Sequence, residues 1–182
     1  MITSDTTVRP WHGAHPTIHP EAFVMEGVRI IGDVVIGAGS SIWYNTVIRG
    51  DVTWVRIGAD SNVQDGCILH VTAPHNPLII GDRVTIGHGV KLHGCTLEDE
   101  SFVGIGAIVL DGAVVESGAL VAAGAVVPPR MRVPAGTVVA GVPAQYLRDV
   151  KPEELADRPN HALRYRHYAL EHSATMPNSY GH

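Results

Sequence analysis

Aliphatic side chains recur every six residues through most of the chain. An α-helix buries every third or fourth residue and a half-buried strand every second, so neither produces a period of six. The pattern predicts short strands separated by tight corners, with three hexads closing one triangular coil of about eighteen residues. All nineteen repeat positions are Val, Ile or Leu: Val24, Ile30, Ile36, Ile42, Ile48, Ile57, Val63, Leu69, Ile80, Ile86, Leu92, Leu97, Val103, Val109, Val115, Val121, Val127, Val133 and Val139.

Small side chains accompany this repeat. Ala107 and Ala113 each lie four residues after an aliphatic position, and Gly37 lies directly after one. Stacked coils form parallel strands about 4.8 Å apart, and the stretch from Val24 to Val139 has room for about six triangular coils. A β-sandwich is the alternative, but its strands alternate with a period of two and do not hold a period of six in phase. We therefore expect an all-β coil.

The end of the chain has a different pattern. Residues 151–154, Lys-Pro-Glu-Glu, predict a helix start, with proline in the first turn and acids at the positive end of the helix dipole. We expect Pro159 to interrupt this helix and a second helical piece to span residues 160–171. The predicted organisation is a coil domain over residues 1–150 and a C-terminal helical segment with a flexible tail over residues 151–182, in which residues 173–182 are disordered and without a role.

The composition of the chain excludes some classes of binding partner. The chain has 182 residues, enough for one domain with an appendage, and its 13 Lys and Arg against 18 Asp and Glu give a formal charge of -5. Without a basic cluster, nucleic acid and anionic membranes are not expected partners. The first ten residues are polar and no long apolar run occurs, so we expect a cytoplasmic protein. Cys67 and Cys95 have no metal or disulfide spacing and are expected to be buried thiols.

Two breaks in the period are as informative as the repeat. Nine residues separate Ile48 from Ile57 and eleven separate Leu69 from Ile80, which we interpret as hexads with excursions of three and five extra residues. With these looped out, Ile48, Leu69 and Leu92 are three hexads apart and occupy the same edge of successive coils. The residues that follow them, Arg49, His70 and His93, should form one vertical column.

A third histidine belongs to a different edge. His88 follows Ile86, and its counterparts one coil earlier are Gln64 and Asp65. Within one prism it cannot easily reach the column of His70 and His93, but between neighbouring prisms around a three-fold axis it can. Three neutral imidazoles with an open fourth position are typical of a catalytic zinc site. Each histidine alone could equally be a corner or interface residue.

These residues belong to an ordered set of motifs. The chain resembles the hexapeptide-repeat family of left-handed parallel β-helices over residues 20–148. Within it, five elements in order resemble the motif set of the γ-class carbonic anhydrases: Arg-Gly-Asp at 49–51, Asn-Val-Gln-Asp at 62–65, His70, Gly-His-Gly at 87–89, and His93. The resemblance implies a left-handed parallel β-helix with a C-terminal α-helix, assembled as a homotrimer. It also makes His70, His88 and His93 the metal ligands.

The resemblance assigns further roles. Gln64 would orient the metal-bound water or bicarbonate, with Asn62 near it in the pocket. Arg49, Asp51 and Asp65 would form a charged network across the trimer seam, in which Arg49 can bind an anionic product through two hydrogen bonds. Structural pairing is the alternative for these three.

The chain also departs from the family pattern. Val52 stands where the archaeal prototype has a glutamate, and the loop from Thr72 to Pro77 contains no acid, although the prototype uses an acidic loop for proton transfer. His75 on that loop is a candidate shuttle, because imidazole exchanges protons near neutral pH, and an idle surface histidine is the alternative. Bacterial homologues use a tyrosine of the C-terminal helix near the pocket, which Tyr165 matches loosely.

The predicted function is a carbonic anhydrase-like lyase that interconverts carbon dioxide and bicarbonate through a metal-bound hydroxide. Zinc is the expected metal, and imidazole ligands also suit iron and cobalt. Two alternatives stay open. One is an acyltransferase or thioesterase that acts on a CoA thioester, with a histidine as general base. The other is a trimeric metal-binding protein with little activity.

Overall fold

Strands of the repeat stack into a left-handed parallel β-helix, which a computed structural model shows for residues 1–3 and 5–175. Within these residues the strands form two sheets. The larger sheet wraps around two sides of the coil and contains β1 (Thr7–Arg9), β2 (Thr17–Ile18), β4 (Arg29–Ile36), β6 (Val47–Ile57), β8 (Ile68–His70), β9 (Leu78–Ile80), β11 (Lys91–His93), β12 (Thr96–Leu97), β14 (Ile108–Val109), β15 (Val114–Val115), β17 (Val126–Val127) and β18 (Arg132–Val133).

The second sheet forms the remaining side. Its strands are β3 (Phe23–Val24), β5 (Ser41–Ile42), β7 (Asn62–Val63), β10 (Thr85–Ile86), β13 (Phe102–Val103), β16 (Leu120–Val121), β19 (Thr137–Ala140) and β20 (Gln145–Asp149). Neighbouring strands pair in parallel from β3 to β19, and β20 closes the sheet by pairing antiparallel with β19.

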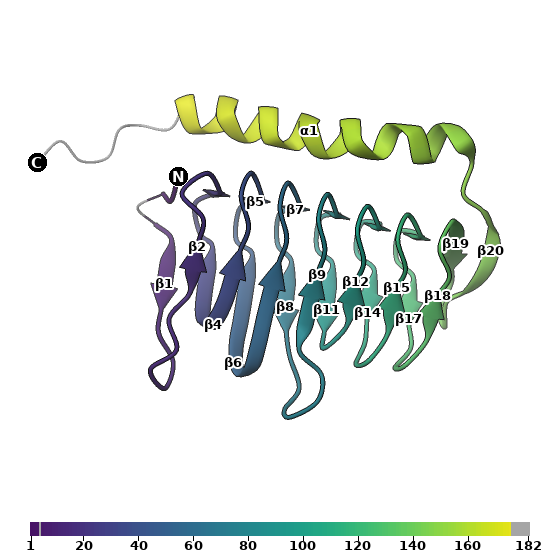
Figure 1. Cartoon of the computed structure of the whole chain (residues 1–182), viewed down its shortest axis with the longest axis horizontal. Coiled ribbons are helices and arrows are strands. Elements are labelled where there is room, and N and C mark those ends of the chain that lie inside the picture. Colours follow the sequence, from purple (N-terminus) through teal and green to yellow (C-terminus); the bar gives the residue numbers. More distant parts are fainter. Residues whose placement is uncertain (4, 176–182) are drawn as a thin grey trace, which may run out of the picture.

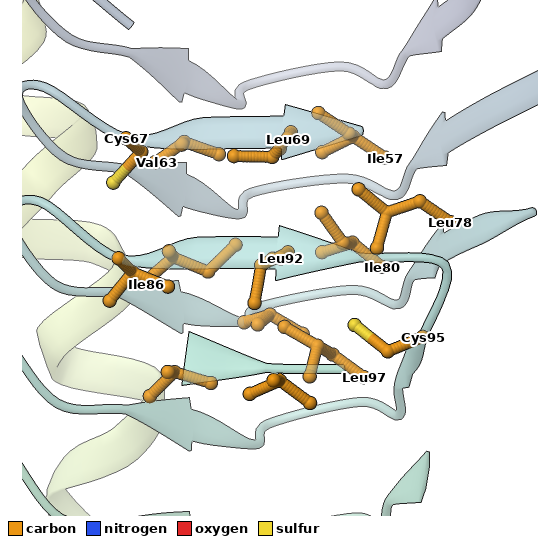
Figure 2. Close-up of a cluster of buried hydrophobic side chains, with 14 of the residues drawn as sticks. Ile57, Val63, Cys67, Leu69, Leu78, Ile80, Ile86, Leu92, Cys95 and Leu97 are labelled. Carbon is orange, nitrogen blue, oxygen red and sulfur yellow. The ribbon is translucent and has the colours of Figure 1, made fainter. Parts of the chain in front are cut away.

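The hexad positions point into the coil and form its core. Figure 2 shows Leu69, Ile80, Ile86, Leu92 and Leu97 converging on the interior from all sides. Each of the nineteen positions is buried, with at most 3% of its surface exposed. This burial of aliphatic surface is the main force that holds the stack together. Cys67 and Cys95 are buried free thiols, as predicted, and burial raises the pKa of each to about 12.

The coil has about seven turns, so the predicted number of six is slightly low. The additional turn comes from the N-terminal segment, where β1 and β2 pair in parallel with β4. Ile18 of β2 lies one hexad before Val24, but the residues before Ile18 do not keep the period, and the strands form because β4 offers an unpaired edge to them. Figure 1 shows it as the first layer beside the N-terminus.

One continuous helix, α1 (Pro152–Thr175), follows the coil. It begins at the predicted proline, and the carboxylate of Glu154 accepts a hydrogen bond from the Lys151 amide at 2.8 Å, which caps the first turn. The predicted break at Pro159 is wrong, because α1 continues through it and buries Ala162 and Ala169 farther along. Residues 173–175 are helical rather than disordered, and the rest of the predicted tail lies outside the described residues.

The helix lies along the second sheet and runs back towards the N-terminal turns (Figure 1). Its side-chain contacts follow this direction. Arg158 donates to the carbonyl oxygen of Glu100 at 2.9 Å, Arg166 pairs with Asp60 at 3.1 Å, and His172 contacts the hydroxyl of Tyr44 at 2.8 Å. No helix of the described residues is long and apolar enough to cross a membrane.

Candidate metal centre

The predicted column of Arg49, His70 and His93 is present. Strand β8 pairs in parallel with β11 so that His70 lies directly beside His93. Strand β6 pairs with β8 in the register that sets Ile48 beside Leu69, which brings Arg49 to the same edge one coil earlier. Because the two excursions leave the register of the hexads intact, the position of this column followed from the period alone.

The two imidazoles face each other. Nδ1 of His70 lies 3.1 Å from Nε2 of His93, and the ring planes are inclined by 60°. Two ligands of a tetrahedral ion with metal–nitrogen bonds of about 2.05 Å are about 3.3 Å apart. The spacing of these nitrogens therefore fits two positions of one coordination sphere.

The ring nitrogens of His70 and His93 that point away from each other are hydrogen-bonded to carboxylates. Nε2 of His70 donates to Oδ1 of Asp51 at 3.1 Å, and Nδ1 of His93 donates to Oδ1 of Asp111 at 2.8 Å. A carboxylate only accepts, so each outer nitrogen carries the proton. In neutral rings the two inner nitrogens then present lone pairs to each other. A cation shared by both nitrogens removes this repulsion, which is the chemistry of a metal-ligand pair.

Burial favours the neutral state that a metal ligand needs. The pKa of His70 is lowered below its ordinary value, first by burial and then by the nearby charge of Arg49, and the hydrogen bond to Asp51 opposes this only in part. For Asp51, burial raises the pKa, but the hydrogen bonds from Arg49 and His70 outweigh it and the carboxyl pKa is lowered. A neutral imidazole next to an ionised carboxylate results.

Asp111 is a member of the site that the sequence analysis missed. It also accepts a hydrogen bond from the hydroxyl of Thr72 at 3.2 Å, which fixes the carboxylate beside His93. The signal was available, because Asp111 follows His93 by three hexads and belongs to the same column. An aspartate at this position is not itself one of the imidazole ligands, so its role as a hydrogen-bond partner of His93 shows only in the structure.

His88 lies on the other edge, as predicted. It stands in the turn after β10, and its Nδ1 donates to Oδ2 of Asp65 at 2.7 Å. Half of its side chain is exposed, at 49%. In the part of the chain that the structure describes, no three His, Cys, Asp or Glu side chains are arranged to hold one metal ion. One chain therefore offers two facing ligands at one edge and a single ligand at another.

Gln64 and Asn62 lie on the edge of His88. Both are buried beneath α1, and Nε2 of Gln64 donates to Oδ1 of Asn62 at 3.2 Å. Tyr165 of α1 is on the same side, where its ring packs edge-on against Trp43 at 5.7 Å. Its pKa is raised by burial and by the negative charge of Asp65. These residues accompany His88 and do not approach the His70 column within one chain.

Arg49 stays beside the column. Its guanidinium donates to Oδ2 of Asp51 at 2.5 Å. Both residues line a cavity of about 280 Å³ together with Arg9 and Trp11. His75 lies on the loop closed by the paired backbone hydrogen bonds between Thr72 and Asn76, each 3.0 Å long. Arg49 and Asp51 thus form an ion pair within one chain, while Asp65 pairs with His88, and the predicted network across the trimer seam stays a prediction.

Comparison with known proteins gives consistent matches. The family model described as bacterial transferase hexapeptide (six repeats) matches residues 15–50. The chain is 49% identical over 164 residues to mitochondrial γ carbonic anhydrase 1 of Arabidopsis thaliana, covering 87% of the chain but 60% of that protein. It is 45% identical over 150 residues to a carbonic anhydrase of Geobacillus kaustophilus, covering 82% of each.

A solved structure matches along nearly the whole chain. The crystal structure of a hexapeptide transferase family protein from Anaplasma phagocytophilum superposes with a TM-score of 0.87 at 40% identity, covering 91% of this chain and 97% of that one. The present chain thus spans somewhat over half the length of the plant relative, and nearly the full length of the solved protein.

Proposed function

Because the chain belongs to the γ-class carbonic anhydrase-like family of hexapeptide-repeat proteins, we propose that it catalyses the reversible hydration of carbon dioxide to bicarbonate at a metal ion held between two copies of the chain. The two carbonic anhydrases to which the chain is similar support the reaction. His70 and His93 of one copy and His88 of the next are the proposed ligands. Zinc is the proposed ion, and iron or cobalt fits the same ligands.

One observation carries this proposal. Each of the three histidines donates one ring nitrogen to a carboxylate: His70 to Asp51, His88 to Asp65 and His93 to Asp111. This arrangement fixes the tautomer and the orientation of a ring, and it makes the remaining nitrogen a better metal ligand. In all three histidines the other ring nitrogen is thereby left to bind a metal ion.

The third ligand requires a second copy of the chain. The edge that bears His88 differs from the edge that bears His70 and His93, so a contact between them joins unlike surfaces. Repetition of such a contact forms a ring when the rotation between copies closes, and three is the smallest cyclic number above a pair. We propose a homotrimer with three equivalent sites.

The bound ion would supply positive charge that polarises a water molecule and lowers its pKa towards neutrality. Residues of the protein would orient the reacting water and bind the product. The amide oxygen of Gln64 accepts a hydrogen bond from the reacting water, and Asn62 holds that amide in place. Arg49 faces the cavity beside the column and binds the anionic product, since a guanidinium donates two parallel hydrogen bonds to bicarbonate.

Hydration of carbon dioxide by water yields bicarbonate and one proton, so a proton must leave in each cycle. Tyr165 and His75 are the two proposed carriers. Tyr165 lies near Asp65 under the influence of its charge, and His75 lies on the exposed loop beyond Thr72. Both can exchange a proton with solvent water, Tyr165 by relaying it through its hydroxyl.

A second candidate is acyl transfer from a CoA thioester, favoured by the similarity to the hexapeptide transferase family protein of Anaplasma phagocytophilum. Such a reaction needs one histidine as a general base and no metal. A mechanism with one general base does not account for a carboxylate hydrogen-bonded to each of the three histidines. Metal content separates the two candidates.

The test uses purified full-length protein loaded with zinc, cobalt or iron. We expect one ion per chain by elemental analysis and carbon dioxide hydration in stopped-flow assays with a pH indicator. His70→Ala and His88→Ala should each lose the metal and the activity, whereas His167→Ala on the exposed face of α1 should lose neither. A His88→Ala protein with full metal content contradicts the shared site, and a metal-loaded protein without hydration contradicts the reaction.

A further inference from the structure

A chain of buried polar groups connects Gln64 to the helix. Gln64 Nε2 donates to Asn62 Oδ1 at 3.2 Å, and Asn62 Nδ2 donates to Thr85 Oγ1 at 3.0 Å. Thr85 Oγ1 lies 3.1 Å from Nδ1 of His161 on α1. The first three side chains are at least 96% buried. Since such groups have little access to water, their mutual hydrogen bonds decide how each is oriented.

The direction of this chain has an independent anchor. Asn62 Nδ2 also lies 3.5 Å from the carbonyl oxygen of Val84, and a carbonyl oxygen only accepts. The amide nitrogen of Asn62 therefore faces Val84 and Thr85, and its oxygen faces Gln64. Gln64 must then donate to Asn62 through Nε2, which leaves Oε1 to accept a hydrogen bond elsewhere.

The Thr85 hydroxyl can both donate and accept, so the donor and acceptor order of these hydrogen bonds could reverse at this residue. Its hydroxyl accepts from Asn62 only while its own proton goes to another acceptor. If the proton turned to Asn62, the amide of Asn62 would flip, and Gln64 would offer Nε2 instead of Oε1 at its far end. The lone pair on Nδ1 of His161 is the acceptor that the structure provides for this proton.

The surroundings of His161 keep that lone pair available. Its ring packs against Phe102 at 5.5 Å and Tyr165 at 5.2 Å. Its pKa is lowered by burial first and by the positive charges of Arg164 and Arg158, while Asp157 opposes the shift. On the sheet side it meets the uncharged Thr85 and Phe102. His161, Phe102 and Glu154 also line a pocket between α1 and the sheet, separate from the cavity beside Arg49.

From this geometry we propose that His161 is a positioning residue, which acts through Thr85 and Asn62 to hold Gln64 with its amide oxygen as the hydrogen-bond acceptor at the metal site. The inference rests on the proposed function for the role of that oxygen. It adds a residue of the C-terminal helix that touches neither ligand nor substrate. Through this residue the covering helix α1 would hold the orientation of the active-site amide.

The direct test observes the amide itself. In ¹⁵N-labelled, metal-free full-length protein, the side-chain amide signals of Gln64 and Asn62 are assigned and their hydrogen exchange is measured. We expect His161→Phe, which keeps an aromatic ring, and Thr85→Val, which keeps the shape, to shift both signals and to speed exchange of the Asn62 amide. His161→Gln, which can present an acceptor oxygen, should restore the native values, and His167→Phe on the outer face should leave them unchanged.

The functional test uses the same variants with metal. His161→Phe and Thr85→Val should lower kcat for hydration by about tenfold or more with KM and metal content unchanged, because a misplaced group loses its alignment with the reacting atoms. The double variant should be no worse than either single one, since both cut the same chain. Effects that multiply in the double variant overturn the proposal.

The two possible failures are distinguishable. Unchanged amide signals in both His161→Phe and Thr85→Val overturn the positioning role, whatever the activity. The other failure has two parts: the amide signals shift in these variants, but the metal-loaded wild-type protein does not hydrate carbon dioxide. That result supports the hydrogen-bonded chain and overturns the proposed function instead.

Discussion

His93 and Asp111 are eighteen residues apart in the sequence and 2.8 Å apart in space, joined by a hydrogen bond from Nδ1 to Oδ1. The distance of three hexads places them on the same edge of adjacent coils. The hydrogen bond fixes the His93 ring so that Nε2 faces His70. The carboxylate of Asp111 thus orients the His93 ring of the preceding coil for metal binding.

Replacement of Asp111 by Asn tests this preparation. Asn is neutral and can turn either end of its amide towards the ring, so the tautomer of His93 is no longer fixed. We expect metal affinity to fall by about 10- to 100-fold with the coil intact. Titration with a competing chelator measures the affinity, and Glu171→Gln on the exposed side of α1 is the control. Equal affinities of Asp111→Asn and wild type would show that the contact is incidental.

Mixing of two inactive variants tests the shared site. His70→Ala retains His88, and His88→Ala retains His70 and His93, so a mixed trimer regains complete sites. When equal amounts are unfolded and refolded together, about one quarter of the interfaces should contain all three ligands. Metal content and hydration should return to roughly this fraction of wild type. Separately refolded and then combined proteins are the control, and mixtures that stay metal-free argue against ligands from two chains.

Replacement of a buried and of an exposed aliphatic residue by Ala should have very different effects on the free energy of unfolding. Leu97 is fully buried in the coil, while Ile105 at a corner is 58% exposed (Figure 2 shows Leu97). Leu97→Ala should lower the free energy of unfolding by about 2–5 kcal/mol through lost burial and a residual cavity. Ile105→Ala should change it by less than about 0.5 kcal/mol. Urea unfolding monitored by circular dichroism measures both, and similar losses would mean that the buried hexads do not dominate the stability.

Acid should weaken the protein partly through His161. Burial lowers its pKa in the folded state below the value of 6.5 for the unfolded chain, so the unfolded chain binds the proton more readily. The contribution of this residue to stability is complete above pH 6.5 and is lost as the pH falls through the folded pKa. His161→Phe should reduce the acid loss between pH 7 and 5, measured as unfolding free energy against pH. His167→Phe should follow the wild-type curve, and parallel curves for all three proteins would contradict the role of burial.

Tyr165 allows packing and proton transfer to be separated. Its ring contacts with Trp43 and His161 survive in Tyr165→Phe, so stability should change by less than about 1 kcal/mol. If the hydroxyl carries protons, kcat should fall by about tenfold or more with KM unchanged. Added imidazole buffer should restore part of the rate. An unchanged kcat would exclude Tyr165 as the carrier and leave His75→Ala as the next variant to measure.

The candidate site was predictable where it follows the period. The positions of Arg49, His70 and His93 depend on hexad counting and two loops, and the strand pairing confirms each of them. His88 on a separate edge came from the same counting. The ligand roles, the trimer and the metal stay predictions, because they depend on contacts between copies of the chain.

Contacts beneath α1 were not predictable in this way. His161 meets Thr85 across 76 positions of sequence, and no repeat relates the helix to the sheet. The same lack of a period applies to the continuous helix at Pro159 and to the residues before Ile18 in the extra N-terminal turn. There, packing against an existing surface outweighs the local preference of the residues.

The sequence by itself determined the coil, its core and the column of histidines, because a repeated hexad with aliphatic positions can bury its side chains in only one register. Tertiary structure alone decided which nitrogen of each ring faces inward and which helix residue is linked to Gln64 through Asn62 and Thr85. Those choices depend on the hydrogen-bond partners that reach each group from other coils and from α1. A proton on an imidazole is assigned by its neighbours in space, and the period of the chain does not specify them all.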